Sequence, residues 1–418
     1  MSTANDSSHP VVVVGAGMAG LACARTLDEM GLEPLILEAS DRVGGRVGSR
    51  RIDGFSCDLG FQVSMSNYVA LERFVPRDEV PRYPFISGAV VVESSGRCPI
   101  IDPRRAPLAS LRPWLKGLVG LRDLRSVARC RALAKRPSAP WEGLTTRELI
   151  DELGFSTRFR ESFLRPFFGG VLLDDPLTAP ASRFLQAFNR FAHGVAELPA
   201  GGMQALPDAM AAPLGDRIRL NSAVKSLDGT TLILHDGSLI RAQEIVLALP
   251  WPAIRALLGL EADGARERWF GTMAMHFSST DPPSPARLIH LNARKTGWLN
   301  LACCPSQVAP GIAPEGAESI IASFRTGTVP DEAVRDPDDF ADRIRHEVGA
   351  LLELPAGVLR HLATDVIPEA LPARTFKPDL RTLPAGVHLA GDWFANPSID
   401  DAIESGIAAA RRVHVRPV

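Results

Sequence analysis

Residues 11–14 are four consecutive valines that lead directly into residues 15–20, which read G-A-G-M-A-G and match the pattern G-x-G-x-x-G. A β-branched run that is apolar on both faces is typical of a central parallel strand. Residues 21–30 carry apolar side chains at helical spacing, and Gly31 follows as a stop signal. Residues 35–37 then predict a second strand. The order of strand, glycine turn, helix and strand predicts a Rossmann-like unit.

The residue types in this unit have separate physical reasons. Gly15 permits the tight turn, Gly17 lets the backbone approach a pyrophosphate, and Gly20 lets the helix pack against the strand. Ala19 lies between them, where the helix directs free N–H groups and its positive dipole end at the phosphates. Glu38 closes the second strand and can accept hydrogen bonds from ribose hydroxyls. The unit therefore predicts a dinucleotide site, with NAD and FAD both open at this point.

The residues after Glu38 separate these two cofactors. Ala39 follows the acid, and a second glycine pair, Gly44 and Gly45, precedes Arg46. Such a loop can cross back over the pyrophosphate, where Arg46 would supply a charge-assisted contact. These residues resemble the signature of the flavin-containing amine oxidase superfamily, which includes monoamine and polyamine oxidases, protoporphyrinogen oxidase and phytoene desaturase. The resemblance implies FAD as the cofactor and an FAD-dependent oxidoreductase as the activity.

A second motif lies near the C-terminal end. Residues 387–390 predict a short strand that ends at Gly391 and Asp392. In the superfamily that this chain resembles, a strand ending in Gly-Asp presents the aspartate to the ribityl chain. The resemblance therefore assigns Gly391 and Asp392 to the cofactor site.

Residues 398–410 resemble the closing helix of the same superfamily. The resemblance adds Ile399, Asp401 and Ala402 to the cofactor site. A helix N-terminus aimed at the pyrimidine edge of reduced flavin stabilises its negative charge by about 0.3–2 kcal/mol. The superfamily usually has Glu-Gly where this chain has Asp400-Asp401, so Asp401 replaces a glycine that would allow close backbone approach. An ordinary acid-capped surface helix is the alternative.

Two segments between these motifs also resemble the superfamily. Residues 52–62 resemble the segment that approaches the flavin, which makes Gly60 a candidate site residue; a plain β-turn is the alternative. Residues 219–227 and 231–238 alternate like a hairpin. In the superfamily a strand here lies by the adenine, with a backbone contact at the position of Val224.

The length of 418 residues is too great for one simple core, so we expect an α/β fold of two domains. A discontinuous Rossmann-like FAD-binding domain would comprise residues 1–80, 200–255 and 360–418. A mixed α+β substrate-binding domain would comprise residues 81–199 and 256–359.

Composition excludes several classes of function. The net charge of −2 gives no reason to expect a nucleic-acid partner. The six cysteines have no metal-type spacing, and we expect buried free thiols in a reducing cytoplasm rather than a metal site. Residues 1–10 are polar and lack a secretory pattern, and no apolar run is long enough to span a membrane. These features favour a cytoplasmic protein.

Residues 104–136 differ from the rest of the chain, because they contain ten basic residues and a single acid, Asp123. Apolar residues lie among them at helical spacing: Leu115, Leu118, Leu121, Leu124 and Ala128. A basic amphipathic helix of this kind can lie on an anionic membrane, so peripheral membrane contact is one interpretation. A solvated helix packed on its own domain is the other.

The expected reaction is dehydrogenation of a C–C or C–N bond of a small molecule, with hydride transfer to flavin N5. Oxygen, a quinone or another acceptor would reoxidise the flavin. A binding protein that shares this architecture, such as the GDP-dissociation inhibitors, is the alternative from another class, although those proteins lack a complete flavin-binding set. The sequence identifies no catalytic residue.

The expected strand at residues 269–277 gives evidence about the substrate class. Many amine oxidases carry a lysine that holds a water against flavin N5, and the matching residues 269–277 contain none. His276 could substitute, but a histidine in an apolar strand is more often a packed core residue. Phenylalanines such as Phe163 and Phe167 favour an apolar substrate over an amine. Amine oxidation with release of hydrogen peroxide stays the alternative.

Overall fold

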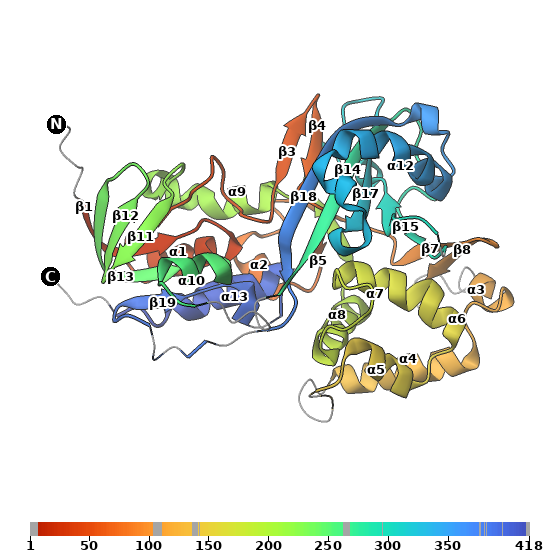
Figure 1. The fold of residues 1–418 in the computed structure, drawn as a ribbon, viewed down its shortest axis with the longest axis horizontal. Coiled ribbons are helices and arrows are strands. Elements are labelled where there is room, and N and C mark those ends of the chain that lie inside the picture. Colours follow the sequence, from red (N-terminus) through yellow and green to blue (C-terminus); the bar gives the residue numbers. More distant parts are fainter. Residues whose placement is uncertain are drawn as a thin grey trace.

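Two seven-stranded sheets organise the chain, and a group of helices lies beside the second sheet (Figure 1). The computed structural model describes residues 7–102, 111–135, 141, 143–261, 268–294, 296–375, 378–379, 381, 383–394 and 396–414.

The first sheet contains the strand-turn-helix unit expected from the N-terminal sequence. Its central strand β1 (Ser7–Val14) lies between β2 (Leu35–Leu37) and β13 (Leu239–Leu247), and all three are parallel. The strand β19 (Val387–Leu389) also pairs with β13 in parallel, so only one strand separates the C-terminal motif from β1. The remaining strands are β10 (Ile218–Arg219), β11 (Val224–Asp228) and β12 (Thr231–Leu234).

Helices cover both faces of this sheet, and together they form the first lobe. Val11 and Val13 point into a core shared with α1 (Met18–Glu29) and α13 (Ile399–Ala410). The alternate valines, Val12 and Val14, share a second core with α10 (Trp251–Leu257). Both faces of β1 are therefore buried from Val11 to Val14, which explains why this part of the strand carries only apolar side chains.

The second lobe is built on the second sheet, whose long strands β14 (Trp269–Ser279) and β18 (Arg360–Pro372) pair antiparallel. The helix α12 (Pro337–Leu352) covers the face that carries Met273, Met275 and Phe277. The other strands are β7 (Gly88–Glu93), β8 (Gly96–Ile101), β15 (Ile289–Asn292), β16 (Leu301–Cys303) and β17 (Glu318–Arg325).

The third unit, the helical lobe, runs from Leu111 to His193 and lies below the second sheet in Figure 1. Phenylalanines at a spacing of four residues stack along it: the ring centroids of Phe155, Phe159, Phe163 and Phe167 lie 5.8, 5.2 and 5.5 Å apart in succession. Its helices are α3 (Leu111–Leu115), α4 (Leu121–Ala134), α5 (Thr146–Leu153), α6 (Thr157–Phe159), η1 (Arg160–Leu164), α7 (Arg165–Val171) and α8 (Ala181–His193).

Shorter elements connect these units. A hairpin joins β3 (Ser49–Ile52) to β4 (Phe55–Asp58), and a three-stranded sheet has the order β5-β9-β6. The elements not yet located are β5 (Ser64–Met65), β6 (Arg82–Pro84), β9 (Ala196–Pro199), α2 (Val69–Phe74), α9 (Ala205–Ala211) and α11 (Asp331–Arg335).

The α/β class and the hairpin of β11 and β12 agree with the sequence analysis. The domain boundaries stay a prediction, and residues 360–372 of the expected cofactor domain form β18, which belongs to the second sheet.

The basic stretch does not form the single amphipathic helix that its leucine spacing indicates. Residues 103–110 and 136 lie outside the described part of the chain, and the rest forms α3 and α4 with a break between them, where Gly117 has a φ of +66°. Of the leucines, Leu118 is buried, whereas Leu115, Leu121 and Leu124 are 81%, 63% and 50% exposed. The side of α4 that packs on its own lobe instead carries Asp123, Ser126, Cys130 and Ala134.

Candidate cofactor site

The glycine loop between β1 and α1 has the backbone geometry that its sequence predicts. Gly15 has a φ of +100°, and a Cβ there would lie 2.6 Å from the carbonyl oxygen of Ala248. A Cβ on Gly20 would lie 1.9 Å from the carbonyl oxygen of Gly15. A side chain is therefore excluded at both positions, because real Cβ atoms do not approach backbone atoms this closely.

The N-terminus of α1 is open, in contrast to the turn that precedes it. Gly17 is the N-cap residue, no side chain caps the helix, and a Cβ on Gly17 would meet nothing within 4 Å. Ala19 is buried in the first turn. Uncapped N–H groups that face open space are what a phosphate requires, so this end of α1 fits the pyrophosphate of a dinucleotide.

The second glycine pair lies against the first loop. Gly44 donates its N–H to the carbonyl of Ala16 at 2.8 Å, and a Cβ on Gly45 would lie 3.3 Å from the Cα of Gly17. Gly44 and Gly45 have φ values of +107° and +59°, which favour glycine. The loop that was expected to cross back over the pyrophosphate thus lies beside the start of α1.

Glu38 lies at the end of β2, and its carboxylate faces the glycine loop. One carboxylate oxygen accepts the N–H of Ala16 at 2.8 Å, and the other accepts the N–H of Ser40 at 2.9 Å. Ala39 is exposed beside it. These contacts fix the carboxylate at the edge of the loop and leave it partly open, as a ribose-binding acid requires.

Arg46 joins the N-terminal loop to the C-terminal motif. Its guanidinium donates to the Asp392 carboxylate at 2.7 Å and to the carbonyl of Ala370 at 2.9 Å, and it stacks over the Trp269 ring at 5.4 Å. Burial alone would lower the pKa of Arg46, but the Asp392 carboxylate raises it above its ordinary value. Two residues that are far apart in sequence are thus brought into direct contact, while their roles toward a pyrophosphate and a ribityl chain stay predictions.

Gly391 precedes Asp392, and a hydrogen bond ties it to the closing helix. Its N–H donates to Ser405 at 2.9 Å, and a Cβ there would lie 2.2 Å from the Nε1 atom of Trp393, so only glycine fits. The helix α13 follows, with Ile399 and Ala402 half-buried at its start.

The N-terminus of α13 carries two aspartates with different partners. Asp400 is buried and accepts the N–H groups of Ala70 and Leu71 at 2.9 and 3.1 Å. Asp401 bonds to the capping residue Ser398, and burial raises the pKa of its carboxyl. A carboxyl group therefore occupies the position where the superfamily usually has a glycine.

Gly60 and Val224 are the two remaining candidates from the sequence. Gly60 has a φ of +88°, and a Cβ there would lie 3.5 Å from Thr272 of β14 and 3.6 Å from Ile367 of β18, so Gly60 lies against the second sheet. Val224 lies in β11, which β12 and β13 separate from β1. The N–H of Ser222, two residues before Val224, nevertheless donates to the carbonyl oxygen of Glu38 at 2.7 Å. The structure thus brings the glycine loops, Glu38, Arg46 and Asp392 together, and Val224 follows closely on a contact with Glu38.

Sequence reasoning missed the polar side of α8, which comes from the helical lobe. Arg190 contacts Asp400 at 3.1 Å and stacks over the Tyr68 ring at 5.2 Å. Arg183 is 3% exposed, and its Nη1 atom donates to the carbonyl of Pro372. The signal was present as Arg183, Gln186 and Arg190, spaced three and four residues apart on one helix face.

His276 on β14 is a packed core residue. It is 2% exposed, and its Nε2 atom donates to the carbonyl oxygen of Asp58 at 2.9 Å. Burial lowers the pKa of His276 to about 4, so the ring is neutral at pH 7. This environment matches the packed-core alternative given above.

All six cysteines are buried and free, as expected. In the described part of the chain, His, Cys, Asp and Glu side chains form no group of three or more that could hold a metal ion. Within the same ranges, no helix combines the length and the apolar composition that crossing a bilayer requires.

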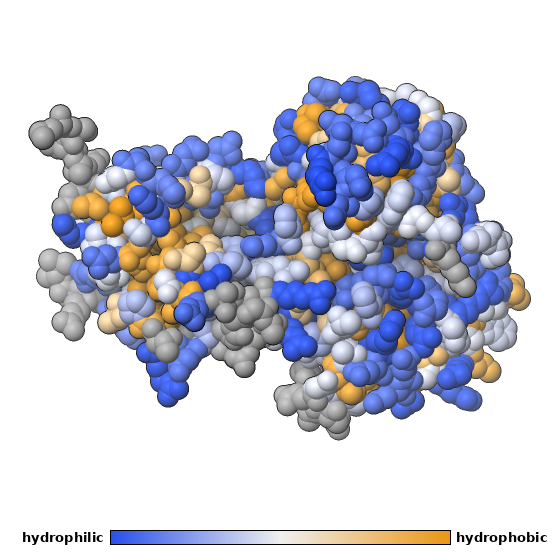
Figure 2. All heavy atoms as spheres, viewed as in Figure 1, coloured by the Kyte–Doolittle hydropathy of each residue, from blue (hydrophilic) through white to orange (hydrophobic). Residues whose placement is uncertain are grey.

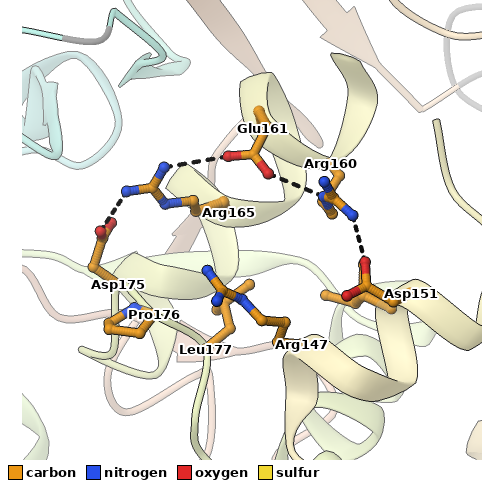
Figure 3. Close-up of a pocket in the computed structure, with 9 residues that line it drawn as sticks. Arg147, Asp151, Arg160, Glu161, Arg165, Asp175, Pro176 and Leu177 are labelled. Atoms are coloured by element: carbon orange, nitrogen blue, oxygen red, sulfur yellow. Dashed lines mark hydrogen bonds and ion pairs between the residues drawn. The ribbon is translucent and has the colours of Figure 1, made fainter. Parts of the chain in front are cut away.

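A cavity of about 300 Å³ lies in the helical lobe and is separate from these motifs (Figure 3). Arg160 and Arg165 both pair with Glu161, and the chain of ion pairs continues to Asp151 and Asp175 at its ends. None of the predicted cofactor residues lines this cavity. The five side chains of these ion pairs satisfy each other, whereas Arg147 also lines the cavity and takes no part in the chain of ion pairs.

Comparisons with known proteins agree with this geometry. The sequence model described as flavin containing amine oxidoreductase matches residues 18–414. The chain is 31% identical over 278 residues to the putrescine oxidase of Kocuria rosea, covering 57% of this chain and 56% of that protein. It is 25% identical over 314 residues to the flavin-containing amine oxidase of Danio rerio, covering 69% and 55%. The chain thus spans about half the length of the curated relatives it matches.

Solved structures share the fold at low identity. A putrescine oxidase bound to putrescine has a TM-score of 0.70 at 18% identity and covers 97% of this chain and 99% of its own. An oxidoreductase from Methanosarcina mazei has a TM-score of 0.76 at 16% identity, with coverages of 96% and 100%. These matches confirm the fold, and the family match confirms both the resemblance and the expected flavin cofactor. The chain belongs to the family of flavin-containing amine oxidoreductases.

Proposed function

We propose that this protein is an FAD-dependent oxidoreductase that dehydrogenates a C–C or C–N bond of a hydrophobic small molecule. Bound FAD would supply flavin N5 as the hydride acceptor. The start of α1 would hold the pyrophosphate, Glu38 the ribose, and Asp392 the ribityl chain. The complete set of motif residues argues against a binding protein that has lost its flavin.

The substrate class is inferred from the side chains on the side of β14 that faces the first lobe. Side chains alternate along a strand, so Thr272, Ala274 and His276 share this side. Ala274 packs in the core of the first lobe, and Thr272 is the residue nearest Gly60. This side of the strand carries no lysine, and its histidine is neutral and bound to a backbone carbonyl. An amine oxidation that requires a lysine-held water has no such group here.

The aromatic side chains near Gly60 support an apolar substrate. Phe61 follows Gly60 directly and is half-buried, and Phe163 and Phe167 are half-buried against the same apolar cluster. The ring of Phe167 also meets that of Phe191 edge to face at 5.0 Å. A hydrophobic molecule bound against these rings would lose water from its apolar surface, which contributes about 25 cal/mol for each Å² buried.

Amine oxidation is the second candidate, because the putrescine oxidase of Kocuria rosea is among the relatives. The purified protein, mixed anaerobically with polyenes, porphyrinogens, primary amines and polyamines, separates the two. We expect a hydrophobic C–C or C–N donor to bleach the oxidised flavin band, with slow reoxidation in air. Rapid turnover of simple amines with release of hydrogen peroxide would support the amine oxidase, and a colourless protein would contradict both.

We also propose that α3 and α4 touch an anionic membrane surface. Trp114, Leu115, Leu121 and Leu124 are exposed, and arginines such as Arg125 are exposed beside them. Apolar groups stand out of a polar surface in Figure 2 where Figure 1 has these helices. Binding to vesicles of anionic lipid should fall steeply with added salt. An absence of binding at every salt concentration would leave only the solvated helix.

A further inference from the structure

Arg183 is a buried cation whose hydrogen-bonding capacity is largely unused. It lies on α8 and is 3% exposed, and its Nη1 atom donates to the carbonyl of Pro372. Within the described residues, its Nε and Nη2 atoms have no hydrogen-bond partner. These two atoms form the edge of a guanidinium that presents two parallel N–H donors, which is the geometry that binds a carboxylate or a phosphate.

Among the described residues, no carboxylate forms an ion pair with Arg183. Within the same ranges, Asp392 is the acidic group that acts on it electrostatically, and Asp392 is already bound to Arg46 at 2.7 Å. Burial accordingly lowers the pKa of Arg183 to about 10. Arg190 and Arg325, in contrast, both form ion pairs with carboxylates. Arg190 contacts Asp400 at 3.1 Å, and Arg325 contacts Asp175 at 2.8 Å.

The position of Arg183 relates it to the cofactor motifs. Pro372 ends β18 and is paired with Trp269, the residue over which Arg46 stacks. Arg46 binds the carbonyl of Ala370 on the same strand end. One guanidinium from the N-terminal loop and one from α8 therefore flank the same strand end. The carboxylates of Asp392 and Glu369 both act on Arg46, whereas among the described residues only Asp392 acts on Arg183.

We propose that Arg183 is an oxyanion-binding residue, which extends from the helical lobe to the Asp392 end of the site. Its ligand is either a phosphate of the dinucleotide or a carboxylate on the substrate. The carboxylate source rests on the proposed function, because it assumes a substrate. The phosphate source rests only on the binding of the cofactor. In either case the ligand would accept hydrogen bonds from the Nε and Nη2 atoms of Arg183, which have no partner among the described residues.

Titration of the flavin-free full chain with FAD and with riboflavin tests the phosphate source. Arg183→Met removes the charge and keeps the length of the side chain, and Arg183→Lys keeps the charge without the two-donor edge. If a phosphate is the ligand, Arg183→Met should weaken FAD binding about tenfold or more and leave riboflavin binding unchanged. Arg183→Lys should recover part of the loss.

A second titration tests the carboxylate source in the FAD-loaded protein. A long-chain fatty acid and the alcohol of equal length are added separately, and the flavin spectrum is recorded. If a substrate carboxylate is the ligand, the acid should perturb the spectrum of the parent and not that of Arg183→Met, while the alcohol should act equally on both. No turnover is measured, so a failure of the proposed reaction is distinguished from a failure of this site.

Thermal unfolding without ligand separates a binding role from a structural one. Arg183→Met should be at least as stable as the parent, because it removes an uncompensated buried charge. The matched control Arg190→Met should be less stable, because it leaves the Asp400 carboxylate without its cation. FAD and fatty-acid binding both unchanged in Arg183→Met would overturn the proposal, and a loss of stability like that of the control would then show a structural role.

Discussion

The first lobe and the helical lobe differ in what holds their helices in place. In the first lobe, α13 lies so close to α1 that a Cβ on Gly406 would be 2.1 Å from the carbonyl oxygen of Ala19. In the helical lobe, α4 turns Leu121 and Leu124 to the solvent and packs through Asp123. The Asp123 carboxylate accepts hydrogen bonds from Gly120 and Ser156, so polar contacts replace apolar ones at its start.

This difference shows that a pattern of apolar residues can predict a helix without predicting which side of that helix is buried. Where two backbones touch, only glycine fits. A glycine inside a helix therefore indicates where another backbone approaches closely. Where a helix packs through an acid, a serine and a cysteine, its leucines no longer report which side is buried. The leucine spacing of the basic stretch therefore predicts helical structure without predicting the orientation of the helix.

The largest expected effect is on the contact between α1 and α13. Gly406→Val should lower the free energy of unfolding by about 3 kcal/mol, because the helices must separate to admit the side chain. Urea unfolding measures the change. Glu404→Val, at an exposed position of the same helix, is the control and should change the free energy by less than about 0.5 kcal/mol. Equal stability of Gly406→Val and the parent would mean that the close approach is dispensable.

The next effect concerns β14, which faces the first lobe through His276. The pKa of His276 is lowered from 6.5 to about 4 in the folded protein. The unfolded chain therefore takes up the proton first, and the stability that this histidine contributes above pH 6.5 is lost as the pH falls through about 4. Relative to His276→Asn, the parent should lose up to about 3 kcal/mol over this interval.

Asp58 acts in the opposite direction, and urea unfolding at several pH values separates the two groups. Burial raises the pKa of Asp58 from 3.8 to about 6. Its contribution is fully present below pH 3.8 and is lost as the pH rises through about 6. The two slopes oppose each other near pH 5 in the parent, and His276→Asn should reveal a stability that falls from pH 4 to 6. Parallel pH profiles of parent and variant would contradict the shift of His276, and a variant whose stability does not fall from pH 4 to 6 would contradict the shift of Asp58.

A smaller effect is expected on cofactor affinity in the first lobe. Glu38→Ala should weaken FAD retention by about 1.5–3 kcal/mol, because it removes a charge-assisted acceptor at the end of β2. Dialysis followed by the flavin absorbance measures the loss. Asp41→Ala, an exposed acid in the same loop, should retain the cofactor like the parent. Full FAD occupancy in Glu38→Ala would remove its assignment as the ribose ligand.

The smallest effect on stability is expected on α4. The double variant Leu121→Ser and Leu124→Ser should change the free energy of unfolding by less than about 0.5 kcal/mol, because both side chains are exposed. Its binding to anionic vesicles should nevertheless fall below that of the parent. A large loss of stability would show that these leucines pack within the protein, and the contrast between the two lobes would disappear.

The sequence allowed most of the first lobe to be predicted, because its features are local. The turn at Gly15, the strand end at Glu38 and the closing helix are all set by neighbouring residues. The pairing of Arg46 with Asp392 was not predictable, because it depends on how β1, β13 and β19 align. The position of Arg183 depends in addition on how α8 packs against β18, and residue spacing gives no information about that contact.

The pairing of β19 with β13 has a consequence for how the protein is made. The ribosome releases the glycine loop early, whereas β19 and α13, which complete the sheet and cover α1, are synthesised last among the described elements. A nascent chain therefore holds the apolar side of α1 exposed until β19 and α13 arrive, and it cannot join Arg46 to Asp392 before then. If Asp392 contacts the cofactor as proposed, capture of the cofactor would follow this late step, and the earlier exposure of α1 favours aggregation.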